Sequence, residues 1–205
     1  MPASISGTVD DMEDYFYTTF DRTMTVSPYL IALIISDYKF TEDVFTDEGT
    51  LVRVGGPKNV IDSGLGDYAL EMAKRILQGM SDYYAYDYSK SFGPNGAKSD
   101  QVGVDKFSAG AMENWGLVTY QTYLTYIFPE TSYQSSVLST ASVIGHELQH
   151  QWTGNLVTCD WWDNLWINEA FADLGGYLGL RWAEPTWNWR SEFYVDEFTG
   201  TVRNS

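Results

Sequence analysis

Two histidines and two glutamates are spaced so that they could bind a metal ion and use it. His146 and His150 are the only histidines of the chain, and Glu147 follows the first of them. Residues four apart on a helix lie on one face, one turn apart, so both imidazoles can reach one metal. Glu147 is then placed to take a proton from a metal-bound water, and Glu169 can supply a third ligand. Because this set leaves a fourth position open, as catalytic zinc requires, we expect one zinc ion (Zn2+) per chain.

The residues around this motif are apolar and aromatic, which indicates a buried helix. Val143 and Ile144 precede the motif, Trp152 follows it, and several tryptophans lead up to Glu169. An unpaired charge is costly in such surroundings. Metal binding would remove that cost for Glu169 and would give both histidines a partner. The flanks therefore favour a metal site over two unrelated surface histidines.

Two segments of the chain resemble a known enzyme family. Residues 146–172, HELQHQWTGNLVTCDWWDNLWINEAFA, resemble the zinc-binding helix pair of the aminopeptidase N family of gluzincins. Residues 110–116, GAMENWG, resemble the exopeptidase motif of that family, at the family's distance upstream. The resemblance covers about residues 24–182. It implies a zinc metallo-aminopeptidase that releases N-terminal amino acids from peptides.

The resemblance implies a role for each matching residue. His146, His150 and Glu169 would bind zinc. Glu147 would be the general base. Glu113, which in another context would be an ordinary loop acid, would bind the free α-amino group of the substrate by a charge-assisted hydrogen bond. The other residues that the motif places at the substrate are Gly110, Ala111 (through its backbone), Met112 and Asn114.

The chain departs from the family pattern at several positions. Ala170 stands where the family usually has glycine, and Gly176 stands where it usually has a further acid. Such an acid orients a ligating histidine. Asp173, one turn after Glu169, either replaces it, as in a similar pattern of thermolysin-like enzymes, or is an ordinary acid on the helix surface.

These departures leave two alternative functions open. Ala170 and Gly176 are compatible with a catalytically impaired, zinc-bearing ectodomain that acts as a binding surface or receptor. Thr153, where most aminopeptidases have phenylalanine, is compatible with an epoxide hydrolase related to them. The resemblance also implies that the chain is a fragment, because the family's transition-state tyrosine would lie beyond Ser205.

Composition narrows the class of protein further. The 205 residues are 44% hydrophobic and 16% aromatic, which is ample for a folded core. A net charge of −16 argues against nucleic acid and against anionic membranes as partners. The longest apolar run, residues 29–35, is too short to span a bilayer, so a membrane anchor would have to lie outside these residues. The protein is expected to be either membrane-anchored and extracellular or cytoplasmic, and the resemblance favours the extracellular location.

The fold class expected is α+β: the N-terminal part of a thermolysin-like zinc peptidase catalytic domain, preceded by the end of a β-sheet domain. A Gly-Gly-Pro sequence places the boundary between residues 1–56 and residues 57–205. Apolar, β-branched runs predict strands at residues 29–35 and 51–54. Helices are expected at residues 68–84, 134–152 and 164–182, an edge strand within 107–120, and some helix in 187–205. The candidate helix caps are Asp62, Ser63, Ser132 and Ser135.

Overall fold

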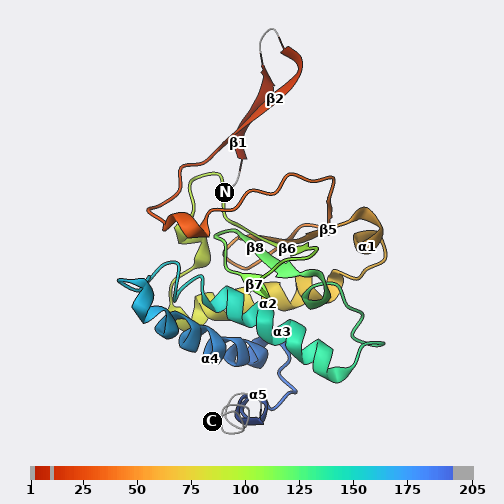
Figure 1. The fold of residues 1–205 in the computed structure, drawn as a ribbon, viewed down its shortest axis with the longest axis vertical. Helices are drawn as coiled ribbons and strands as arrows, with labels where there is room; N and C mark the ends of the chain where they lie inside the picture. Colours follow the sequence, from red (N-terminus) through yellow and green to blue (C-terminus); the bar gives the residue numbers. More distant parts are fainter. Residues whose placement is uncertain (1–2, 10–11, 196–205) are drawn as a thin grey trace.

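The computed structural model describes residues 3–9 and 12–195 and places a mixed sheet above a layer of helices (Figure 1). The strand order is β3-β5-β6-β8-β7, and β4 also pairs with β5. β5, β6 and β8 run parallel to one another, whereas β3, β4 and β7 pair antiparallel with their neighbours. The strands of this sheet are β3 (Lys39–Phe40), β4 (Val44–Phe45), β5 (Leu51–Gly56), β6 (Lys98–Val104), β7 (Ala111–Met112) and β8 (Leu117–Gln121).

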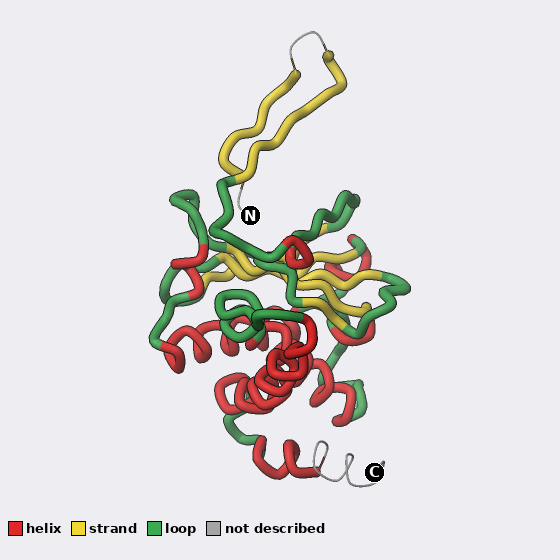
Figure 2. Tube along the Cα trace, turned by 60° about the vertical axis from the view of Figure 1, so that its left-hand side comes forward, coloured by secondary structure: helices red, strands yellow, loops and turns green. Residues whose placement is uncertain are grey.

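The long helices lie on one face of the sheet (Figure 2). α2 lies against β5 and β6, and α3 and α4 pack against each other and against α2. Burial of the apolar face of α2 provides much of the driving force for this packing. No helix of the described residues is long and apolar enough to cross a membrane. The helices are α1 (Lys58–Asp62), α2 (Asp67–Tyr84), α3 (Gln134–Gln149), α4 (Leu165–Ala183) and α5 (Trp189–Phe193).

The helices confirm the predicted segments, but the predicted caps are wrong. Gly66 occupies the N-cap of α2, and Tyr133 occupies that of α3 without a side-chain hydrogen bond. A short extra helix, α1, ends at Asp62 with Ser63 as its C-cap, so both residues lie before Gly66, the true N-cap of α2. The carboxylate of Asp62, at the end of α1, binds Lys39 and Lys58 instead. The residues wrongly predicted as caps are Asp62, Ser63, Ser132 and Ser135.

The buried strand predicted at residues 29–35 is also wrong. The segment starts in a 3-10 turn, η1 (Pro28–Leu30), and continues without strand structure. Ile31, Leu33 and Ile35 are exposed, Ile35 by 89%. β-branched residues favour a strand only where a neighbouring strand pairs with them and a face is buried. In the described part of the chain, the edges of the sheet are β3 and β7, and this segment pairs with neither.

The remaining expectations concern the domain boundary after residue 56 and the C-terminal tail. The predicted strand at residues 51–54 is confirmed within β5, and β5 ends at the predicted domain boundary. β5 pairs in parallel with β6, so strands from both sides of that boundary share one sheet, and the division stays a prediction. Before the sheet, β1 (Ala3–Val9) and β2 (Met12–Phe20) form an antiparallel hairpin that projects from the side opposite the helices (Figure 1). In the tail, α5 confirms some helix, and residues 196–205 lie outside the described residues.

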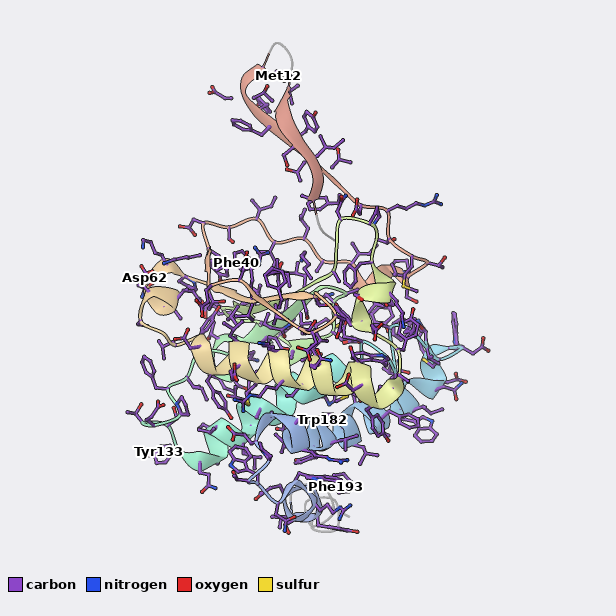
Figure 3. All side chains as sticks on the ribbon, turned by 180° about the vertical axis from the view of Figure 1, so that it is seen from behind. Met12, Phe40, Asp62, Tyr133, Trp182 and Phe193 are labelled. Carbon is purple, nitrogen blue, oxygen red and sulfur yellow. The ribbon has the colours of Figure 1, made fainter. Side chains whose placement is uncertain are left out.

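α3 and α4 approach so closely that both need glycine at the contact. A Cβ atom added at Gly145 would lie 2.6 Å from the carbonyl oxygen of Gly176. A Cβ atom added at Gly176 would lie 2.7 Å from the carbonyl oxygen of Ser142. Further along α4, the indole of Trp182 (Figure 3) occupies the space over Gly79 of α2. This packing fixes the two helices that carry the predicted metal site relative to each other.

Candidate metal centre and active site

His146 in α3, His150 at the C-cap of α3 and Glu169 in α4 form a compact group, here called the ligand cluster. The Nε2 atoms of the two histidines lie 3.1 Å apart. Oε2 of Glu169 lies 3.3 Å from Nε2 of His146 and 3.6 Å from Nε2 of His150. A tetrahedral zinc ion with bonds of about 2.0–2.1 Å separates its ligand atoms by about 3.3 Å. The ligand cluster is therefore spaced to hold one metal ion.

The outer nitrogen of each imidazole has its own partner. Nδ1 of His150 lies 3.2 Å from the carbonyl oxygen of Thr153, and Nδ1 of His146 lies 2.9 Å from Oδ1 of Asp173. When Nδ1 carries the hydrogen atom and donates a hydrogen bond to this partner, Nε2 has a free lone pair and is the atom that can bind a metal. Asp173 thus contacts a residue of the ligand cluster, and of its two interpretations the structure favours the histidine-orienting acid.

The charges of the ligand cluster are arranged to receive a cation. Burial disfavours the protonated form of His146, but hydrogen bonds to Asp173 and Glu169 outweigh it and raise the pKa of His146 to about 10. Hydrogen bonds from His146 and His150 hold the pKa of Glu169 well below its usual range. A metal ion would take the place of these protons, so its binding releases protons and weakens as the pH falls.

Glu147 lies beside the ligand cluster with a free oxygen. Glu147 is only 5% exposed, and its Oε2 atom has no hydrogen-bond partner among the described residues. Burial raises the pKa of Glu147 to about 7, although the charges of His146 and His150 oppose the shift. A carboxyl group that exchanges its proton near neutral pH, with one oxygen free, is suited to general-base chemistry.

The exopeptidase-like segment, residues 110–114, brings a second carboxylate to this place. Ala111 and Met112 form β7, which is the edge strand expected there. Glu113 follows directly, and an oxygen of its carboxylate lies within 4.8 Å of a carboxylate oxygen of Glu147 and of a ring nitrogen of His150. The sheet edge and α3 therefore present two acids to the same small volume.

The two outer residues of that segment have supporting hydrogen bonds. The carbonyl oxygen of Gly110 accepts a bond of 2.9 Å from the backbone of Gln121. Oδ1 of Asn114 accepts one of 3.1 Å from the hydroxyl of Thr119, and the Asn114 side chain is buried. Both bonds tie the segment to β8.

Glu113, Glu147 and His150 could also hold a metal ion by their spacing. This second group would use the same Nε2 atom of His150, because Nδ1 contacts Thr153. The ligand cluster fits better, because it offers two oriented imidazoles and leaves the unpartnered oxygen of Glu147 free.

Sequence reasoning overlooked two buried amides that contact the exopeptidase-like segment. The side chains of Gln151 and Asn155 both donate to the carbonyl oxygen of Glu113. The available signal was an amide residue at each of two positions, one and five residues after the second histidine.

Comparisons with known proteins agree with this geometry. Residues 68–204 match the peptidase family M1 domain. Aminopeptidase N of Rattus norvegicus is 42% identical over 183 residues, which are 89% of this chain and 18% of that protein. Aminopeptidase N of Homo sapiens is 41% identical over 188 residues, 92% of this chain and 19% of that protein. Glutamyl aminopeptidase of Bos taurus is 34% identical over 197 residues, 96% of this chain and 20% of that protein.

The chain thus spans about a fifth of the length of these relatives. The family match nevertheless covers more than half of the chain and includes every residue of the ligand cluster. It also includes Glu113 and Glu147, the two acids beside that cluster. On these matches, the chain belongs to peptidase family M1.

Proposed function

We propose that this chain forms the zinc-binding and substrate-anchoring part of an aminopeptidase that releases N-terminal amino acids from peptides. The observation that carries the proposal is the closeness of Glu113 to Glu147 and His150. An aminopeptidase must hold a free α-ammonium group one residue away from the bond that it hydrolyses. A fixed carboxylate next to a general base and a metal site meets that need. The names of the relatives support the same activity.

The metal-binding residues and the two other acids have separate roles in this proposal. His146, His150 and Glu169, which lie within reach of one another, would hold the zinc ion, and the ion would supply Lewis acidity at the carbonyl of the first peptide bond. Glu147 accepts a proton from the attacking water and passes it to the leaving amine, so it ends the cycle as it began. Glu113 pairs with the α-ammonium group of the substrate and thereby places the first peptide bond at the metal site.

The proposed partners are peptides with a free N-terminus. Between a membrane-anchored extracellular location and a cytoplasmic one, the family resemblance favours the extracellular location. The strongly acidic chain, with a net charge of −16, makes nucleic acid an unfavourable partner.

The second candidate function is a receptor that binds zinc but does not catalyse a reaction. Its support is that Ala170 and Gly176 differ from the residues usual in the family. Gly176 faces the backbone of α3, where a side chain has no room. Asp173 contacts His146 in the way that the usual acid of the family was expected to act. These two relationships account for one of the departures without loss of catalysis, and they weaken the case for a receptor.

The test is hydrolysis of an alanyl-coumarin substrate by the protein in its full natural length, with zinc determined on the same sample. We expect one zinc ion per chain and hydrolysis that a chelator abolishes and added zinc restores. The N-acetylated substrate should be cleaved far more slowly. A protein that is fully loaded with zinc and cleaves neither substrate would contradict the aminopeptidase and favour the receptor.

A further inference from the structure

The carbonyl oxygen of Glu113 is held by two buried side-chain amides. Nδ2 of Asn155 lies 2.9 Å from this oxygen and Nε2 of Gln151 lies 3.1 Å from it. Asn155 is 4% exposed and Gln151 is 2% exposed. A carbonyl oxygen has two lone pairs, so both of its acceptor positions are occupied. Two donors on one buried oxygen form a specific clamp, because each amide would be costly to leave unpaired.

The clamp acts just beyond the backbone pairing of β7 with β8. β7 pairs with β8 only through Ala111 and Met112, and Glu113 lies just beyond this ladder. After it, the backbone N–H of Trp115 donates to the carbonyl oxygen of Leu30, at 3.2 Å. The backbone of Glu113 itself is therefore placed by Gln151 and Asn155 rather than by strand pairing.

The same two residues are bonded to the helix that carries the base and a ligand. Nε2 of Gln151 also lies 3.1 Å from the carbonyl oxygen of Glu147. The backbone N–H of Asn155 donates to the carbonyl oxygen of His150, at 2.9 Å. A single set of hydrogen bonds therefore runs from Glu147 and His150 through the two amides to Glu113.

We propose that Gln151 and Asn155 are positioning residues that set the location of the Glu113 carboxylate relative to the metal centre. They thereby determine how strongly the site prefers a ligand with a free amino group. This inference rests on the proposed function, because it takes Glu113 as the group that binds the substrate ammonium. Neither amide touches the substrate; they act through the backbone of Glu113.

A matched residue separates this role from a general contribution to folding. Gln149 lies two residues before Gln151 and is 1% exposed. Its amide donates to the hydroxyls of Tyr84 and Thr153 and not to Glu113. Gln149→Met and Gln151→Met therefore remove the same amide at the same burial, and only the second releases Glu113.

The experiment measures binding and does not need turnover. Titration calorimetry on the zinc-loaded protein in its full natural length compares leucine hydroxamate with the same hydroxamate lacking the amino group. Both compounds bind the metal through the hydroxamate, so the ratio of their Kd values reports the amino group. We expect Gln151→Met and Asn155→Ala each to reduce this ratio by about tenfold, with zinc content unchanged. Gln149→Met should keep the wild-type ratio.

The outcomes separate this inference from the proposed function. If the wild-type ratio is large and Glu113→Gln abolishes it, Glu113 binds the amino group. Wild-type ratios in both Gln151→Met and Asn155→Ala would then overturn the positioning role alone. An equal loss in Gln149→Met would also overturn it, because the loss would reflect general loosening. If the wild-type protein shows no preference, the proposed function of Glu113 fails first. Should one variant not fold, the other decides.

Discussion

Oδ1 of Asp173 lies 2.9 Å from Nδ1 of His146, so an acid on α4 orients a side chain of the ligand cluster that comes from α3. The contact fixes which nitrogen of His146 faces the metal site. Hydrogen bonds of this kind raise the basicity of a ligating histidine and hold its ring in place. The contact also links the two helices at the point where the proposed chemistry occurs.

Asp173→Ala should weaken zinc binding by about ten- to a hundredfold, because His146 loses the partner that orients it. Competition with a chromogenic chelator measures the affinity. Asp163→Ala is the control, since Asp163 accepts a hydrogen bond from its neighbour Asn164 and has no contact with the ligand cluster. Equal zinc affinity in wild type and Asp173→Ala would show that the contact is incidental.

Gly176→Ala should destabilise the protein by about 1–3 kcal/mol, because the added methyl group would press against the backbone of α3. It should also lower zinc affinity, since α3 and α4 carry different members of the ligand cluster. Thermal unfolding and chelator competition measure the two effects. Gly179→Ala is the comparison: its Cβ would lie 3.2 Å from the side chain of Ile76 and would meet no backbone as closely. A loss at Gly176 no larger than at Gly179 would refute the packing explanation.

Gly176 also shows what sequence alone can and cannot reveal. The spacing of the apolar residues and of His146, His150 and Glu169 predicted two helices and a shared ligand site, because helical periodicity is a local property. The reason for glycine at position 176 depends on how closely α3 and α4 approach, which no local pattern contains. By sequence alone, Gly176 is only the absence of an acid; the structure shows that the backbone of α3 leaves no room for a side chain at this position.

The same limit explains other errors and omissions. Residues 29–35 have the composition of a strand, but whether a strand forms depends on a partner elsewhere in the protein. The hydrogen bonds from Gln151 and Asn155 to Glu113 join segments about 40 residues apart in the sequence. Only the three-dimensional arrangement shows that these amides serve the exopeptidase-like segment.

Glu147→Gln should retain zinc and lose activity by about 10²- to 10⁴-fold, which is the range for removal of a general base. Glutamine keeps the shape of the side chain but cannot accept the proton of the attacking water. Zinc content and kcat are measured on the same preparation in its full natural length. A variant that keeps at least half of the wild-type kcat would remove Glu147 from the role of base.

Glu147 should also make the stability of the metal-free protein depend on pH. Its pKa is near 4.5 in the unfolded chain and about 7 in the folded protein, because burial opposes its charge. Below the lower value the carboxyl group is protonated in both states. Between the two values it ionises only in the unfolded chain, so a rise in pH favours unfolding. Relative to Glu147→Gln, the wild type should lose up to about 3 kcal/mol across this window, at about 1.4 kcal/mol per pKa unit.

Denaturant unfolding of both proteins in the presence of a chelator, at several values between about pH 4 and pH 8, tests this expectation. The raised pKa of His146 acts in the opposite direction, but its larger causes, the hydrogen bonds to Asp173 and Glu169, are present in both proteins and so contribute equally to the comparison. The difference in the free energy of unfolding should shift in favour of Glu147→Gln as the pH rises and level off above about pH 7. A difference that stays constant over the whole range would mean that Glu147 keeps an ordinary pKa and is not held in a desolvated position.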